Sequence, residues 1–223
     1  MERHFDQELA ALREKLLEMS GTVEQSVHKA TRALETRDPV LVEEVFTDDK
    51  RVDVLEIEIG DLCVSLLALR QPMAVDLRFI VGAIVINNEL ERMGDHAVNI
   101  AQCVRDLLRM PAHKPPVDIE RMVQLVTGMV KESLDAFISR DASKAQAVCE
   151  RDDRVDDLKT QIVDRLVGIM TMNSDAINRG VSLILISRNL ERIADLATNI
   201  AEETIFISEA RVIKHHAEEG EIT

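Results

Sequence analysis

The residues in this chain whose types and spacing suit metal coordination are pairs of acidic residues four positions apart. The pairs are Asp49 with Asp53, Glu91 with Asp95, Asp152 with Asp156, and Glu191 with Asp195. On an α-helix, residues four apart lie on one face, one turn from each other. Each pair would therefore present two carboxylates in one direction. Such oxygen ligands suit a hard divalent or trivalent cation such as Mg²⁺, Mn²⁺ or iron, and less often Zn²⁺.

The four pairs belong to an internal duplication. Residues 81–101 align with residues 181–201, and 11 of the 21 positions are identical. Upstream, the D-x-R-x-D block at 49–53 matches the block at 152–156. The offset changes from 103 to 100 between these blocks, so the second copy lacks three residues there. Copies of this length are too long for a solenoid repeat, and we expect two tandem domains, residues 1–112 and 113–223.

Each copy is predicted to form three helices. In the first copy, apolar residues recur at three- and four-residue steps along Phe5–Leu34, Val45–Leu69 and Leu90–Leu107, the spacing of one helix face. In the second copy the helices are expected at 118–139, 142–172 and 174–213. Asp38 and Asp141 are expected to be N-caps of the second helix of each copy. No alternating strand pattern occurs, so the predicted fold is all-α: two tandem antiparallel three-helix bundles.

The acid pairs of neighbouring helices are expected to lie level. With the corner near residue 72, Asp53 lies 19 residues before it and Glu91 lies 19 after it. Asp49 and Asp95 are each 23 residues away. In antiparallel helices these four acids would lie side by side, roughly 30 Å from the corner. The second copy keeps this relation around residue 173, and the helical angles place both sets on the bundle surface.

Two plainer interpretations stay open. An acidic pair on an exposed helix is commonly just solvated, and arginines that also recur could neutralise the acids in ion pairs. These arginines are Arg51, Arg92, Arg154 and Arg192. The recurrence at matched height favours a metal site, because gathered carboxylates repel one another unless a cation lies between them. His96 follows Asp95, but its counterpart is Leu196, so the shared chemistry does not require histidine.

Composition and charge exclude several classes of protein. The chain carries 41 acidic and 27 basic residues, a net charge of −14, and contains no Trp or Tyr. Such a surface repels phosphate backbones and offers no stacking platform, which excludes nucleic-acid binding. Three cysteines without C-x-x-C spacing are typical of a reducing compartment. The longest apolar run, residues 79–86, is too short to cross a bilayer. We expect a cytoplasmic protein that meets membranes only through partners.

Residues 79–86 and 181–186 are apolar on nearly all sides of their helices. A three-helix bundle covers only one stripe of each helix, so the remaining apolar faces need another partner. Either the two copies pack on each other or the chain forms a homodimer. The sequence leaves both arrangements open.

The repeated blocks resemble the PhoU family of bacterial phosphate-uptake regulators across essentially the whole chain. The resemblance is carried by L-E-R-x-x-D-x-x-x-N-I-A at 90–101 and 190–201 and by D-x-R-x-D at 49–53 and 152–156. Some members of that family carry multinuclear metal clusters on repeated acidic motifs. The resemblance implies metal ligands at Asp49, Asp53, Glu91, Asp95, Asp152, Asp156, Glu191 and Asp195. The Leu196 position leaves open a difference in nuclearity or occupancy between the two clusters.

The resemblance also implies a function without catalysis of its own. It predicts a negative regulator of phosphate uptake and phosphate-starvation signalling. Such a regulator couples the ATPase of a phosphate ABC transporter to a phosphate-sensing histidine kinase.

Two other functions stay open. A ferritin-like di-metal enzyme needs inward-facing Glu-x-x-His motifs, whereas residue 94 is Gly and residue 194 is Ala here. A metal-free helical adapter is the stronger alternative.

Overall fold

The computed structural model describes residues 2–70, 72–112 and 118–211, and within these ranges it contains helices and no strand. The first repeat consists of α1 (Glu2–Thr36), α2 (Pro39–Arg70) and α3 (Ala74–Leu108). The second consists of α4 (Ile119–Ser139), α5 (Ala142–Cys149), α6 (Asp152–Met172), a 3₁₀ turn η1 (Ser174–Ala176) and α7 (Ile177–Glu209). The predicted all-α, duplicated three-helix architecture is confirmed.

The helices form because their apolar residues follow the helical period. On α1, for example, Leu12, Leu16, Met19 and Val23 are fully buried and lie three or four residues apart, so they share one face. Burying a side chain of this size contributes roughly 1.5–3 kcal/mol. The core is built almost entirely from such aliphatic residues.

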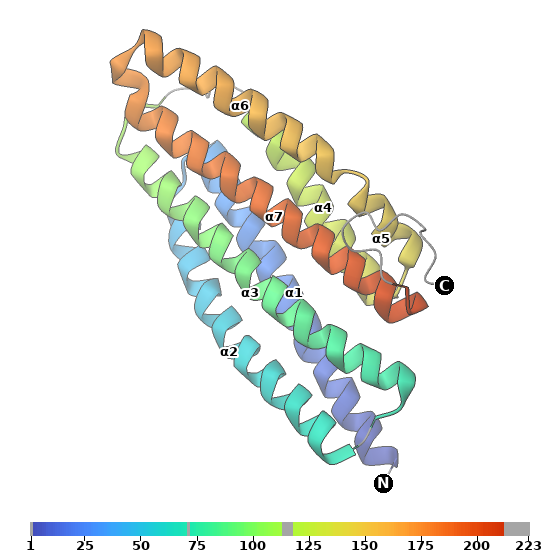
Figure 1. The fold of residues 1–223 in the computed structure, drawn as a ribbon. Coiled ribbons are helices and arrows are strands. Elements are labelled where there is room, and N and C mark those ends of the chain that lie inside the picture. The colour runs from blue at the N-terminus through green and yellow to red at the C-terminus, as the bar shows by residue number, and fades with distance from the viewer. Residues whose placement is uncertain (1, 71, 113–117, 212–223) are drawn as a thin grey trace.

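The two repeats pack on each other through α3 and α7. These two helices lie side by side in the middle of the molecule, with α2 and α6 on the outer sides (Figure 1). The corner between α2 and α3 lies at one end and the corner between α6 and α7 at the other, so α3 and α7 run antiparallel. Packing of the repeats therefore covers much of the spare apolar surface. Val81 and Val181 nevertheless remain 41% and 46% exposed.

One predicted helix is wrong in detail. The stretch expected as a single helix over 142–172 is interrupted between α5 and α6. Glu150 and Arg151 have ψ angles of −6° and −11°, and the backbone N–H of Arg151 donates to the carbonyl of Val148 three residues back at 3.0 Å. This tightening breaks the α-helical hydrogen-bond ladder. The Arg151 guanidinium is held by Glu132 of α4, with one contact of 2.8 Å.

The predicted helix caps are present. Asp141 Oδ1 accepts from the backbone N–H groups of Ser143 and Lys144, each at 3.1 Å, and Asp38 Oδ1 accepts from Val40 N at 2.9 Å. The third helix of the second repeat starts as η1 at Ser174, as expected, and α7 is described to Glu209. The expected end at 213 and the linker 113–117 lie outside the described residues, and the domain boundary at 112/113 stays a prediction. No described helix is long and apolar enough to cross a membrane.

Candidate metal-binding clusters

Antiparallel packing within each repeat gathers the predicted acids into two clusters. The first cluster comprises Asp49, Asp53 and Glu56 of α2 with Glu91 and Asp95 of α3. The second cluster comprises Asp152 and Asp156 of α6 with Glu191 and Asp195 of α7. Every one of these side chains is exposed or half-buried. The clusters therefore lie at the bundle surface, as the helical angles predict.

Two carboxyls of the first cluster, Asp49 and Glu91, have a raised pKa. Burial raises the pKa of Asp49, and the charges of Asp53 and Asp95 raise it further. Burial also raises the pKa of Glu91, followed by the charges of Asp95, Glu56, Asp53 and Asp49. The charge of Asp95 on α3 acts on Asp49 of α2, as expected for acids that lie near each other on neighbouring helices. Among the described residues, none of the five forms an ion pair with a basic side chain.

Two carboxyls of the second cluster, Asp152 and Asp195, also have a raised pKa. Burial raises the pKa of Asp195 to about 6, helped by the charges of Glu191 and Asp152 and opposed by Arg192. Burial likewise raises the pKa of Asp152, although the Thr198 hydroxyl donates to it at 3.3 Å and acts in the opposite direction. Carboxylates that repel one another in this way are stabilised when a cation lies among them.

The donor set fits a hard cation, but the carboxylates do not surround a common point. All the gathered ligand atoms are carboxylate oxygens, which Mg²⁺, Mn²⁺ and iron accept readily. In the described part of the chain, however, no three His, Cys, Asp or Glu side chains are placed so as to hold a metal ion. A bound ion would require the carboxylates to turn toward each other. The predicted ligands and the metal itself therefore stay predictions.

The recurring arginines do not neutralise the two clusters equally. Arg51 pairs with Glu18 of α1, and Arg92 pairs with Glu89 at 3.3 Å, so neither is paired with the first cluster. In contrast, Arg192 reaches Asp195 of the second cluster at 2.9 Å. The interpretation of the acids as ordinary ion-pair partners thus holds only for part of the second cluster.

Polar residues at the contact between α3 and α7 were not predicted from the sequence. Glu89, which is buried, accepts from Asn199 Nδ2 at 3.2 Å. His96 Nδ1 lies 2.9 Å from Asn189 Oδ1. These contacts place His96 at the junction of the repeats. The all-round apolar character of residues 79–86 indicated only that this helix needs a further packing partner, and the polar contacts depend on the register between α3 and α7.

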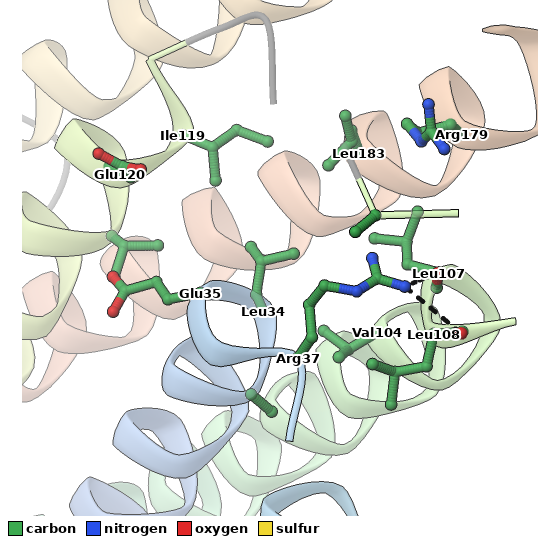
Figure 2. Close-up of a pocket in the computed structure, with 13 residues that line it drawn as sticks. Leu34, Glu35, Arg37, Val104, Leu107, Leu108, Ile119, Glu120, Arg179 and Leu183 are labelled. Atoms are coloured by element: carbon green, nitrogen blue, oxygen red, sulfur yellow. Dashed lines mark hydrogen bonds between the residues drawn. The ribbon is translucent and has the colours of Figure 1, made fainter. Parts of the chain in front are cut away.

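A cavity of about 550 Å³ lies at one end of the junction between the repeats. It is lined mainly by apolar side chains such as Leu34, Val104 and Leu183, as Figure 2 shows. Two guanidiniums at the cavity donate to backbone carbonyls near the end of α3. Arg37 Nη2 donates to the carbonyl of Leu107 at 3.0 Å, and Arg179 Nη2 donates to that of Pro111 at 2.8 Å. None of the eight predicted metal ligands lines this cavity.

The fold and these clusters define a class of protein: a duplicated helical bundle with a surface carboxylate cluster in each half. The PhoU domain family matches this chain twice, over residues 16–104 and 119–204. The chain belongs to the PhoU family.

Relatives match along nearly their whole lengths. The phosphate-specific transport system accessory protein PhoU homolog of Aquifex aeolicus is 40% identical over 216 residues, which is 96% of this chain and 98% of that protein. The homolog of the same name from Clostridium acetobutylicum is 36% identical over 204 residues, which is 91% of this chain and 93% of that protein. The crystal structure of PhoU from Pseudomonas aeruginosa matches with a TM-score of 0.89 at 36% identity, covering 93% of this chain and 100% of that one. The phosphate transport system regulatory protein PhoU from Streptococcus pneumoniae matches with a TM-score of 0.83 at 30% identity, with coverage of 93% and 98%.

Proposed function

We propose that this protein is an accessory regulator of a phosphate-specific transport system. It acts in the cytoplasm as a negative regulator of phosphate uptake and of phosphate-starvation genes. The observation that carries this proposal is the family match in both repeats, together with relatives named as phosphate-specific transport system accessory proteins that align over nearly their full lengths. In this role it couples the ATPase of the phosphate ABC transporter to a phosphate-sensing histidine kinase.

The proposed mode of action is binding rather than catalysis. Long helices present extended outer faces to partners, and several of their apolar side chains stay exposed in the single chain. On the junction helices these include Leu77, Val81, Ile84, Ile177, Val181 and Leu185. Exposed apolar surface favours association, and we propose a homodimer that covers part of it.

The carboxylate clusters are proposed to hold hard metal ions, with the eight predicted acids as ligands. When bound, the ion supplies positive charge that offsets the repulsion among the carboxylates. Because each cluster draws on two helices, metal binding would tie α2 to α3 and α6 to α7. The raised pKa of Asp49, Glu91 and Asp195, caused by burial and then by neighbouring carboxylates, supports this proposal.

The regulatory proposal is tested by gene deletion in the organism that carries this chain. Deletion should leave the phosphate-starvation genes switched on in high phosphate, as measured by reporter expression. Restoring the full chain should re-establish repression. Unchanged repression after deletion would contradict the assignment.

A metal-free adapter is the second candidate, favoured by the absence of three converging ligands among the described residues. Elemental analysis of protein purified without chelator separates the two. The metal proposal expects bound metal that is lost in the double variant Asp95→Asn, Asp195→Asn. The matched control is Asp61→Asn, which removes one carboxylate from α2 outside the first cluster. Metal content unchanged by the double variant would show that the ligand assignment is wrong.

A further inference from the structure

The helix α2 lies at the outer side of the molecule (Figure 1) and carries a row of apolar side chains on its exposed face. Val54, Ile57 and Val64 are 45%, 63% and 65% exposed. Steps of three and four residues place such positions on one helix face, as in the seam of a coiled coil. The row, here called the α2 stripe, consists of Lys50, Val54, Ile57, Asp61, Val64 and Ala68, all of them exposed.

The duplicated helix α6 shows that the fold does not require this stripe. At the offset of 103 the equivalent positions of α6 carry Asp153, Asp157, Thr160, Asp164, Val167 and Thr171. Only one of these six residues is apolar, so the same face of α6 is an ordinary solvated surface. Both repeats fold as three-helix bundles with or without the stripe. The apolar residues of the α2 stripe therefore suit a contact outside the single chain.

Two opposite charges, Lys50 and Asp61, interrupt the apolar row. Other charged residues of α2, namely Asp48, Arg51 and Glu58, form ion pairs with α1. Within the part of the chain that the structure describes, Lys50 and Asp61 form none. They are eleven residues apart on one helix, roughly 16 Å along its axis, so they do not meet within a single chain.

A second copy of the chain would supply the partners that these charges lack. When two α2 helices lie antiparallel about a twofold axis between residues 55 and 56, Lys50 of each copy faces Asp61 of the other. In the same register Val54 of each copy faces Ile57 of the other. The centre of the contact is then apolar, and an ion pair closes each end of it. A twofold axis at residue 61 would instead bring the two copies of Asp61 together, so charge selects the first register.

We propose that the α2 stripe is the surface through which two copies of this protein associate, with Lys50 and Asp61 pairing across the twofold axis. This inference rests on the homodimer proposed above and names the surface that forms it. A single pair of helices buries less than the roughly 1,600 Å² of a standard interface, and each copy carries a net charge of −14. The dimer should therefore dissociate on dilution. Because α6 lies on the opposite outer side from α2, the second repeat of each copy stays accessible to other partners.

Sedimentation equilibrium of the full chain over a series of concentrations tests this proposal. Wild type should associate as the concentration rises. Lys50→Glu and Asp61→Lys should each raise the dimer Kd roughly tenfold or more, because each turns two ion pairs into two like-charge contacts. The double variant, which has the net charge of wild type, should regain the wild-type Kd.

Mixing the two single variants makes the test independent of folding defects. Neither variant should associate with itself, whereas an equal mixture of Lys50→Glu with Asp61→Lys should form a dimer. The mixed pair again brings opposite charges face to face at both ends of the contact. Circular dichroism establishes that each variant keeps its helical content.

Matched controls come from the second repeat. Val54→Ser should weaken association, whereas Val167→Ser should not, although Val54 and Val167 are 45% and 48% exposed. Asp164→Lys, the charge reversal at the position equivalent to Asp61, should likewise leave the Kd unchanged. A dimer that is indifferent to every α2 variant would overturn the α2 surface while the homodimer stands.

A wild type that stays monomeric at all concentrations would overturn both the homodimer and this inference, whereas the regulatory role is judged separately by gene deletion. If in that case Val54→Ser still abolished repression of the reporter in cells, the α2 stripe would bind a different protein and not a second copy of the chain.

Discussion

At the scale of single residues, Asp195 has the largest pKa shift among the carboxyls of the two clusters. Burial and its acidic neighbours raise the pKa of this carboxyl from 3.8 to about 6, and the nearby Arg192 does not outweigh them. The folded state thus takes up a proton more readily than the unfolded chain. The contribution of the Asp195 carboxyl to the free energy of unfolding is therefore fully present below about pH 4 and is lost as the pH rises toward 6.

We therefore predict that Asp195→Asn changes the pH dependence of stability in metal-free protein. The free energy of unfolding of wild type minus that of the variant should fall between pH 4 and pH 6 and level off above that window. Urea unfolding in the presence of chelator, repeated across this pH range, measures it. A difference that stays constant with pH would show that Asp195 titrates normally in the folded protein.

A second prediction for a single residue concerns the effect on stability of replacing a glycine inside a helix. Gly60 lies within α2, and a Cβ added there would meet nothing within 4 Å. Alanine loses less backbone entropy than glycine on folding into a helix. Gly60→Ala should raise the free energy of unfolding by about 0.5–1 kcal/mol, as measured by urea unfolding. A destabilised variant would mean that this face of α2 is more crowded than the contacts show.

Most of the candidate site follows from residue spacing, but its charge balance does not. The i, i+4 acids and their equal distance from the corner predicted which side chains would meet. The internal offset of 103 also pairs Glu56 of α2 with Lys159 of α6, and Lys159 contacts Glu191 of the second cluster. This difference in charge between the repeats can therefore be found in the sequence. The turn of Arg192 toward Asp195 depends on local contacts with Asn189 and His96 across α3 and α7, which no pattern within one helix reveals.

At the scale of elements, capping holds the beginning of α5. Asp141 accepts two backbone N–H groups of the first turn. The Ser143 hydroxyl also donates to it at 2.7 Å, and this bond, followed by the backbone bonds, lowers the pKa of its carboxyl. Asp141→Ala should reduce the free energy of unfolding by about 1 kcal/mol, whereas Asp141→Ser should retain most of it. Thermal melts of both variants provide the measurement. Equal melting of Asp141→Ala and wild type would contradict a stabilising cap.

The break after α5 marks the limit of prediction from periodicity. The apolar stripe passes from Val148 to Val155 without Gly or Pro between them, so nothing in the local sequence signals an interruption. The ion pair between Arg151 and Glu132 of α4 accompanies the break. Apolar periodicity within one helix cannot predict such a contact between helices.

Close packing of α3 on α7 makes Gly82 sensitive to substitution. A Cβ at this position would lie 2.5 Å from Ile207 Cδ1 and 3.0 Å from Glu203 Oε1. Neighbouring side chains or helices must move to accept it. Gly82→Ala should lower the free energy of unfolding by roughly 1–3 kcal/mol, opposite in sign to Gly60→Ala, and the two variants are compared by the same urea titration. A stabilised Gly82→Ala would show that Ile207 moves aside without penalty.

At the scale of the whole molecule, the sequence predicted the class of fold because apolar residues follow the helical period over long stretches. The corners and most of the helices followed from the same pattern, whereas the interruption between α5 and α6 did not. Whether the repeats would cover each other stayed open, because an all-round apolar segment indicates only that a partner exists. The structure supplies that partner within the chain, through α3 and α7, while leaving Val81 and Val181 partly exposed.

The repeats are consequently expected to depend on each other. Gly82, Glu89 and His96 of α3 contact α7, and the buried Ile86 and Met93 lie on the same helix face by spacing. Residues 1–112 alone would expose this face. We predict that they self-associate, because exposed apolar patches of this kind drive association. Sedimentation at several protein concentrations measures it. A monomeric first repeat that melts cooperatively would contradict the prediction and show that each bundle is stable without the other.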